Sequence, residues 1–262
     1  MSVKTAEKRV GKGAGEDTVL VIASTGAANL ASVRTMCRRL GIKSLVTSEP
    51  SVIEEADYAL LPGVGAFGAA MSRLEETGLD EAFKGRVAQK KPTMGICLGM
   101  QLFCESSEEG PGIKGLGIVP AHVASLDLAM PLPQLGWNYV SPYVSERQGE
   151  YENSMQSAVQ SVEPKGECSF VRPGWAYFAN SYAIESIPEG FIGTVCIYGK
   201  PFVASLELWD SRNAMAPYLL LCQFHPELSG AWGLDLVARW IGSGEKVLDA
   251  KDNSKGANLG KA

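Results

Sequence analysis

Apolar and polar positions alternate in blocks along the first hundred residues of the chain. Short apolar runs predict strands at 19–23, 42–46, 58–61 and 93–96. Between these runs, apolar residues at helical spacing predict helices over 30–40, 69–76 and 79–89. Because strands and helices alternate, this part of the chain predicts parallel strands joined by right-handed crossovers.

The second half of the chain contains strand-like runs without long helical segments between them. These runs lie at 137–140, 175–178, 191–197, 202–207 and 218–224. They predict an antiparallel extension of the sheet, which a final helix over 234–241 completes. We therefore expect an α/β fold with an open, mixed, mostly parallel sheet flanked by helices and extended by antiparallel strands.

Composition divides the chain into one domain and two polar ends. With 262 residues, 45% of them hydrophobic, the chain can form one large α/β domain, which we expect at 18–242. Residues 1–17 are interpreted as a disordered tail and residues 243–262 as a polar tail. The polar stretch 142–174 is predicted to be a surface insertion.

Charge and cysteine usage restrict the partners and the compartment. A formal net charge of −5 without a basic stripe argues against a nucleic-acid binder, and no apolar run is long enough to predict a membrane span. The six cysteines show no C-x-x-C spacing, so we expect reduced thiols, no metal, no cofactor and a cytoplasmic location. Organelle targeting by the N-terminal tail remains an alternative.

The strongest candidate for chemistry is Cys97, which stands between Gly95 and Gly99 where an apolar strand gives way to a helix. This arrangement is typical of a nucleophile elbow, in which small residues let strand and helix approach and the sulfur projects at the carboxyl edge of the sheet. The alternative is a buried structural cysteine, since free cysteine is among the most buried residue types.

A base and an acid for this nucleophile follow the run at 218–224. His225 would accept the thiol proton and later protonate a leaving amine, while Glu227 would orient the imidazole and stabilise its charged form. The other histidine, His122, has no flanking acid or glycine turn, so we interpret it as structural or solvated.

A glycine-rich segment supplies a third element. Gly63 and Val64 follow a predicted strand and can aim backbone N–H groups at a developing oxyanion, together with the N–H of Leu98 after the nucleophile. The alternative is a simple turn, because glycine-rich segments after strands are often no more than that.

Together these residues resemble the class I, or triad, glutamine amidotransferases. The resemblance rests on the elbow at 95–101, the His225-Pro226-Glu227 motif and the loop at 62–65. Finer matches over about residues 19–241 resemble the glutaminase subunits of imidazole glycerol phosphate synthase. These matches are Phe67-Gly68, the run 105–110, Gly115-Leu116-Gly117, Gly136-Trp137-Asn138 and Ser181-Tyr182.

The resemblance implies one part of a two-part enzyme of histidine biosynthesis. This chain would hydrolyse glutamine to glutamate and ammonia through a thioester on Cys97, and pass the ammonia to a cyclase subunit with a (β/α)8 barrel in a heterodimer. The cyclase would bind the phosphorylated ribonucleotide PRFAR and make imidazole glycerol phosphate and AICAR. Because the family's glutaminase is weak until the cyclase and its ligand are bound, we expect an isolated chain to be nearly inactive.

The resemblance also implies roles for individual residues. The catalytic residues would be Cys97, His225 and Glu227. The oxyanion region would consist of Gly63, Val64 and Leu98, with the Val64 peptide reorienting before it donates. The glutamine would be held by Gln101, Ser181 and Tyr182, and the cyclase would be contacted by Asn29 and Trp137.

The chain departs from the family pattern at two positions near these residues. Asn180 stands where the family usually has a histidine, so the glutamine site would contain an amide that can hydrogen-bond but cannot titrate. Leu228 stands where the family often has a lysine that pairs with an acid of the cyclase, and it offers only an apolar contact.

Two other segments have plainer interpretations. Trp137 and Trp175 lie in apolar company, which predicts core packing, although the resemblance favours an interface role for Trp137. The polar row 104–109 predicts a solvated, charged loop, and a family-specific packing role is the alternative.

Two rival function classes stay open at this point. A stand-alone cysteine hydrolase of γ-glutamyl compounds would use the same triad without a partner, so strong activity of the isolated chain would favour it. A non-catalytic regulatory module of the same fold would keep the elbow as a relic. The presence of Cys97, His225 and Glu227 together argues against that module.

Overall fold

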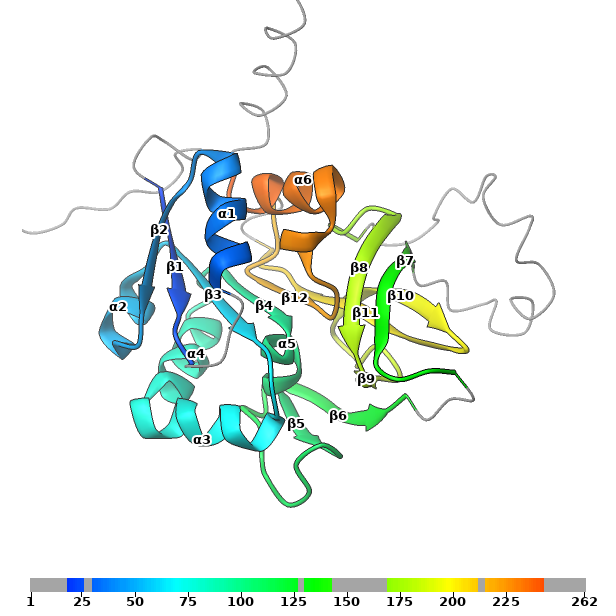
Figure 1. Cartoon of the computed structure of the whole chain (residues 1–262). Helices are drawn as coiled ribbons and strands as arrows, with labels where there is room; N and C mark the ends of the chain where they lie inside the picture. Colours follow the sequence, from blue (N-terminus) through cyan, green and yellow to red (C-terminus); the bar gives the residue numbers. More distant parts are fainter. Residues whose placement is uncertain (1–17, 26–29, 127–129, 143–168, 212–214, 243–262) are drawn as a thin grey trace, which may run out of the picture.

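A nine-stranded mixed sheet forms the centre of the molecule (Figure 1). The computed structural model describes residues 18–25, 30–126, 130–142, 169–211 and 215–242. Within them the strand order is β2-β1-β3-β4-β12-β11-β10-β7-β8. The expected mixed α/β fold is confirmed.

The part of the sheet from β2 to β12 is parallel, as the block pattern predicts. Its strands are β1 (Val19–Ala23), β2 (Lys43–Thr47), β3 (Tyr58–Gly63), β4 (Thr93–Cys97) and β12 (Leu219–Cys222). Although β4 and β12 are far apart in sequence, they are direct neighbours, and Ile96 is level with Cys222. The residues that follow these two strands therefore meet at one edge of the sheet, where open α/β folds place their sites.

From β12 onward the sheet continues with antiparallel pairs, which confirms the predicted extension. Its strands are β11 (Lys200–Leu208), β10 (Ile192–Tyr198), β7 (Gln134–Pro142) and β8 (Gly174–Asn180). Most of the predicted insertion, residues 143–168, lies outside the described residues, as do Asn29 and the two predicted tails. At the described end of the insertion, residues 169–171 are held by the buried carboxylate of Glu207.

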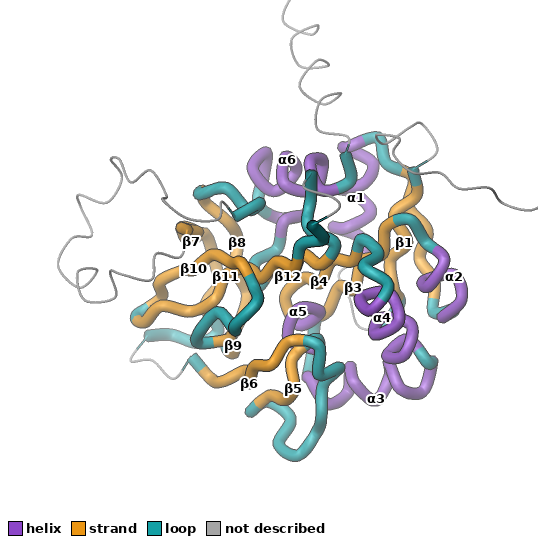
Figure 2. Tube along the Cα trace, turned by 180° about the vertical axis from the view of Figure 1, so that it is seen from behind, coloured by secondary structure: helices purple, strands orange, loops and turns teal. Residues whose placement is uncertain are grey.

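Helices cover both faces of the parallel strands (Figures 1 and 2). One face packs against α1 (Leu30–Leu40) and α6 (Gly230–Trp240). The other face packs against α2 (Pro50–Glu55), α3 (Phe67–Thr77), α4 (Leu79–Ala88) and α5 (Leu98–Leu102). Burial on both faces explains why these strands are continuous apolar runs in the sequence. No helix in the described part of the chain is both long and apolar enough to cross a bilayer.

A separate three-stranded sheet corrects one sequence prediction. It contains β5 (Cys104–Ser107), β6 (Val119–Ser125) and β9 (Tyr182–Ile184) in the order β5-β6-β9. The prediction of a solvated loop at 104–109 is therefore wrong for the residues in β5. Cys104 is buried in the core and Ser107 is also buried, while Glu105 between them is exposed.

Candidate active site

Cys97 forms the turn between β4 and α5. Its backbone has φ 54° and ψ −116°, a conformation that side-chain-bearing residues rarely adopt. This turn is the sharp strand-to-helix elbow that the glycine spacing predicts. The Cys97 side chain lines a pocket, although the residue is only 7% exposed.

Close backbone packing holds the elbow in place. A Cβ atom on Gly99 would overlap the carbonyl oxygen of Leu61, and a Cβ atom on Gly63 would lie 2.6 Å from the Gly99 nitrogen. Only glycine lets α5 approach β3 this closely. The position of the sulfur is therefore set by main-chain contacts between β3, β4 and α5.

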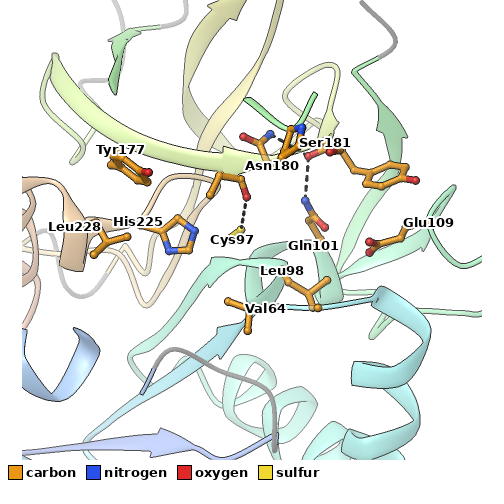
Figure 3. A pocket seen from close by; sticks show the side chains of 14 residues that line it. Val64, Cys97, Leu98, Gln101, Glu109, Tyr177, Asn180, Ser181, His225 and Leu228 are labelled. Carbon is orange, nitrogen blue, oxygen red and sulfur yellow. Dashed lines mark hydrogen bonds between the residues drawn. The ribbon is translucent and has the colours of Figure 1, made fainter. Parts of the chain in front are cut away.

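His225 follows β12 and faces Cys97 across the pocket floor (Figure 3). Its Nδ1 lies 2.9 Å from Oε1 of Glu227, and both side chains are buried. The backbone around the ring is fixed as well, because the His225 N–H donates to the Tyr177 carbonyl at 2.8 Å and the Ser229 hydroxyl donates to the His225 carbonyl at 2.6 Å. The structure thus brings the predicted nucleophile, base and orienting acid together.

The neighbours of His225 favour its protonated form. Burial by itself favours the neutral ring, but hydrogen bonds to Cys97 and Glu227 and the charges of both groups raise the pKa of His225 to about 10. The ring therefore carries a proton near neutral pH. In that state it can pair with a thiolate and later protonate a leaving amine.

A pocket of about 510 Å³ opens beside the sulfur. The predicted site residues that line it, besides the nucleophile and base, are Val64, Leu98, Gln101, Ser181 and Tyr182. Gly63 lines a smaller neighbouring cavity together with His225 and Glu227. The predicted oxyanion and glutamine residues therefore surround one space, with Gly63 behind it.

Hydrogen bonds already fix the wall that the glutamine-binding prediction singles out. The Gln101 side chain donates through Nε2 to the Tyr182 carbonyl at 3.0 Å and to Oε1 of Gln223 at 3.0 Å. The Ser181 carbonyl accepts from the Leu126 N–H at 2.9 Å. Asn180 donates through Nδ2 to the same Tyr182 carbonyl at 3.1 Å, which gives this departure from the family pattern a defined partner.

Two further polar residues belong to the site, although sequence analysis did not identify them. Glu109 lines the pocket and accepts from the Phe67 N–H at 2.8 Å. Gln223 is fully buried, and its Nε2 lies 3.8 Å from the Cys97 sulfur. The sequence contains a signal that places Gln223 in the site. It lies two residues before His225, and side chains two apart in an extended segment point to the same side.

The tryptophans at the sheet edge contradict one sequence prediction. Trp137 is 53% exposed and Trp175 is 59% exposed, so the prediction of core packing is wrong for both. They belong to an exposed group on β7 and β8 that we call the aromatic face, made of Leu135, Trp137, Tyr139 and Trp175. Alternation along β7 places its exposed members two residues apart.

The aromatic face begins beside the pocket. The Trp137 ring packs edge-on against Tyr177 with 6.2 Å between ring centroids, and Tyr177 lines the pocket. Leu228, which is 36% exposed, lines the pocket near His225. His122, by contrast, lies away from these residues, half-exposed in the small sheet and hydrogen-bonded to Ser106 at 2.8 Å, in agreement with a structural or solvated role.

Comparisons with known proteins identify the family. A family model of the CobB/CobQ-like glutamine amidotransferase domain matches residues 27–129. The imidazole glycerol phosphate synthase subunit HisH of Symbiobacterium thermophilum is 36% identical over 230 residues, which cover 88% of this chain and 95% of that protein. The Arabidopsis thaliana protein named imidazole glycerol phosphate synthase hisHF, chloroplastic, is 32% identical over 86% of this chain and 34% of its own length.

Solved structures support the fold alone. A crystal structure of a glutamine amidotransferase is similar with a TM-score of 0.60 at 15% identity, over 85% of this chain and 98% of that one. The identity to HisH over nearly the full length of that protein is far higher and carries the assignment. The chain belongs to the HisH family, the glutamine amidotransferase subunits of imidazole glycerol phosphate synthase.

Proposed function

We propose that this glutaminase subunit of histidine biosynthesis forms a thioester on Cys97 and delivers ammonia to a cyclase, which makes imidazole glycerol phosphate and AICAR from PRFAR. One observation carries the proposal. Cys97 and His225 extend from neighbouring strands to the floor of one pocket, and Glu227 holds the ring of His225. A nucleophile, a proton carrier and an orienting acid are the parts that amide hydrolysis through an acyl-enzyme requires.

The first half of the reaction releases ammonia. The Cys97 thiolate attacks the side-chain carbonyl carbon of glutamine, a C–S bond forms, and the carbonyl electron pair moves to the oxygen. The N–H groups of Leu98 and Val64 stabilise this oxyanion, with the Val64 peptide reorienting to do so. His225 then gives its proton to the amide nitrogen as the C–N bond breaks, so that ammonia leaves and a thioester remains.

The second half of the reaction restores the enzyme. Water attacks the thioester carbon, and His225, now neutral, takes a proton from the water. The C–S bond breaks, the sulfur leaves as a thiolate beside the reprotonated ring, and glutamate departs. Glutamine and water thus become glutamate and ammonia.

Polar residues of the pocket wall support the binding of a free amino acid. Among the residues that line the described pocket, Glu109 is the one carboxylate, and we assign it to the α-ammonium group of glutamine. Its position is fixed by the bond from the Phe67 N–H at the start of α3. Gln101, Ser181 and Tyr182 also line the pocket, and the uncharged amide of Asn180 donates to the same Tyr182 carbonyl as Gln101 does.

The aromatic face supports docking of a cyclase. Large exposed apolar side chains next to a pocket mark protein interfaces, and tryptophan and tyrosine are enriched there. We therefore assign Trp137 to the cyclase contact. The Arabidopsis relative is named hisHF, and the match to this chain covers 34% of its length. Both facts are consistent with a HisH part joined to a second part.

A glutaminase assay with and without a cyclase subunit and PRFAR tests the proposal. We expect little glutamate from the isolated chain and a strong increase when both additions are present. The reason is that the Val64 peptide must shift toward the conformation in which its N–H donates to the oxyanion. Equal, high activity of the isolated chain would instead favour a stand-alone hydrolase. Absence of glutamate in every mixture would favour a non-catalytic module.

A further inference from the structure

Gln223 is the first residue after β12 and comes level with the nucleophile. The last paired residues of the two strands are Cys222 and Ile96, so Gln223 and Cys97 are the next residues along each. The Gln223 N–H donates to the Ala204 carbonyl at 2.9 Å, and the residue is 0% exposed. Because a fully buried amide needs hydrogen-bond partners, its contacts indicate its role.

Both ends of the Gln223 amide have partners in the site. Oε1 accepts from Gln101 Nε2 at 3.0 Å, and Nε2 lies 3.8 Å from the Cys97 sulfur. The orientation follows from Gln101, whose Nε2 also donates to the Tyr182 carbonyl. If the Gln101 amide were turned over, its oxygen would face that carbonyl. Gln223 therefore presents its oxygen to Gln101 and its N–H to the sulfur.

Some neighbours of the Cys97 sulfur favour the thiol form and others favour the thiolate. The Ala179 carbonyl lies 3.7 Å from the sulfur and accepts only from the thiol form. An amide N–H is a better partner for a thiolate than for a thiol, as is a protonated imidazole. Gln223 is therefore a second thiolate partner beside His225, and its amide keeps the same polarity at every pH.

We propose that Gln223 is a further catalytic residue, which stabilises the Cys97 thiolate through its side-chain N–H while Gln101 holds the amide in the required orientation. The proposal rests on the glutaminase function proposed above. When the thioester forms, the sulfur loses its negative charge and this bond weakens. When the thioester is cleaved, the sulfur leaves as a thiolate and the bond is restored. Gln223 thus raises the fraction of Cys97 that is thiolate before attack and assists expulsion of the sulfur.

Alkylation of Cys97 by iodoacetamide tests this role without glutamine or a cyclase. The full chain is treated at several pH values on both sides of neutrality, and modification of the peptide that contains Cys97 is followed by mass spectrometry. In Gln223→Met, a side chain of similar length cannot donate. We expect the midpoint of its pH profile to move upward by about one unit and the alkylation rate on the low-pH side of that midpoint to fall about tenfold, since a hydrogen bond to a charged group is commonly worth at least that much.

A matched control is Gln134→Met, which removes another buried glutamine on β7 and should leave the alkylation profile unchanged. Gln223→Asn keeps the amide but withdraws it from the sulfur, so it should reproduce the slower alkylation even if the methionine variant folds poorly. A wild-type rate and pH profile in folded Gln223→Met or Gln223→Asn would overturn the proposal.

Steady-state kinetics of the complex with a cyclase separate this proposal from the proposed function. Gln223→Met should lower kcat for glutamine hydrolysis about tenfold with little change in KM, because the lost bond is to the reacting sulfur. A larger change in KM than in kcat would count against the proposal and indicate a merely structural role in the pocket wall. If wild-type protein released no glutamate in the complex, the glutaminase proposal would fail, whereas the alkylation difference would still report on Gln223.

Discussion

Apolar side chains are buried at the centre of the nine-stranded sheet and exposed at its β8 edge. Around β3, β4 and β12 the apolar residues are buried by helices of the same chain, and backbone contacts hold the nucleophile. At the edge, Leu135, Trp137 and Trp175 expose 66%, 53% and 59% of their surface. Apolar character therefore predicts that a residue is suited to burial, but whether the covering surface belongs to the same chain depends on its place in the sheet.

The largest expected effect concerns the centre. Cys97→Ala should lower glutamine-dependent synthesis by the complex by on the order of 10⁴-fold or more, because the covalent route is lost, while ammonia-dependent synthesis by the cyclase remains. The two activities are measured with glutamine or an ammonium salt as nitrogen source. Cys37→Ala, which alters a buried cysteine of α1, is the matched control and should keep both activities. Survival of the glutamine-dependent activity in Cys97→Ala would show that another residue is the nucleophile.

The next effect concerns the backbone packing that positions this nucleophile. Gly99→Ala should lower the free energy of unfolding by about 3 kcal/mol, since the new methyl group meets the Leu61 carbonyl and the main chain must shift. Gly85→Ala in α4 is the control, because its Cβ would find the closest atom at 4.0 Å. There, alanine should raise the free energy of unfolding by about 0.5–1 kcal/mol. Urea denaturation measures both, and equal stabilities would refute the packing argument.

At the edge we expect a change in binding without a comparable change in folding. Trp137→Ala should weaken association with the cyclase about 30-fold, as expected for loss of a central aromatic side chain worth about 2 kcal/mol. Calorimetric titration measures the affinity, and a thermal melt shows whether the fold is retained. Leu45→Ala, on β2 at the opposite edge of the sheet and 46% exposed, should bind like wild type. Equal affinities of the two variants would mean that the aromatic face has another role.

The last effect is gradual, a pH dependence of stability at the centre that is small per unit of pH. Because the folded pKa of His225, about 10, lies above the unfolded value of about 6.5, the folded state binds more protons between these values. The resulting stability is fully present below pH 6.5 and is lost as the pH rises toward 10, with a slope of at most about 1.4 kcal/mol per pH unit. Urea denaturation at several pH values should show this decline in wild type and a flatter profile in His225→Asn. Parallel profiles would contradict the raised pKa.

Local signals explain what the sequence predicted well. The parallel strands are unbroken apolar runs, and the elbow is marked by Gly95 and Gly99 around Cys97, so neighbouring residues were sufficient. His225 and Glu227 could be identified because they directly follow such a run. The resemblance to a family then brought the two separated motifs into one site.

The remaining features depend on contacts between distant segments. β5 was missed because a short strand with exposed Glu105 resembles a polar loop until β6 pairs with it. Glu109 is bonded at the pocket to the Phe67 N–H at the start of α3, a contact between segments 42 residues apart. Trp137 and Trp175 were assigned to the core because apolar neighbours in sequence do not reveal that β7 and β8 form the uncovered end of a sheet.

The direct pairing of β4 with β12 makes the chemistry independent of chain length elsewhere. The spacing of two hydrogen-bonded strands brings sulfur and imidazole together, and the bonds of His225 to Tyr177 and Ser229 complete the placement, whatever number of residues connects the strands. Natural variation and protein engineering can therefore lengthen distant turns, such as the one at Gly199 between β10 and β11, without redesign of the reaction centre. Accessory loops can diversify while the catalytic distances stay constant.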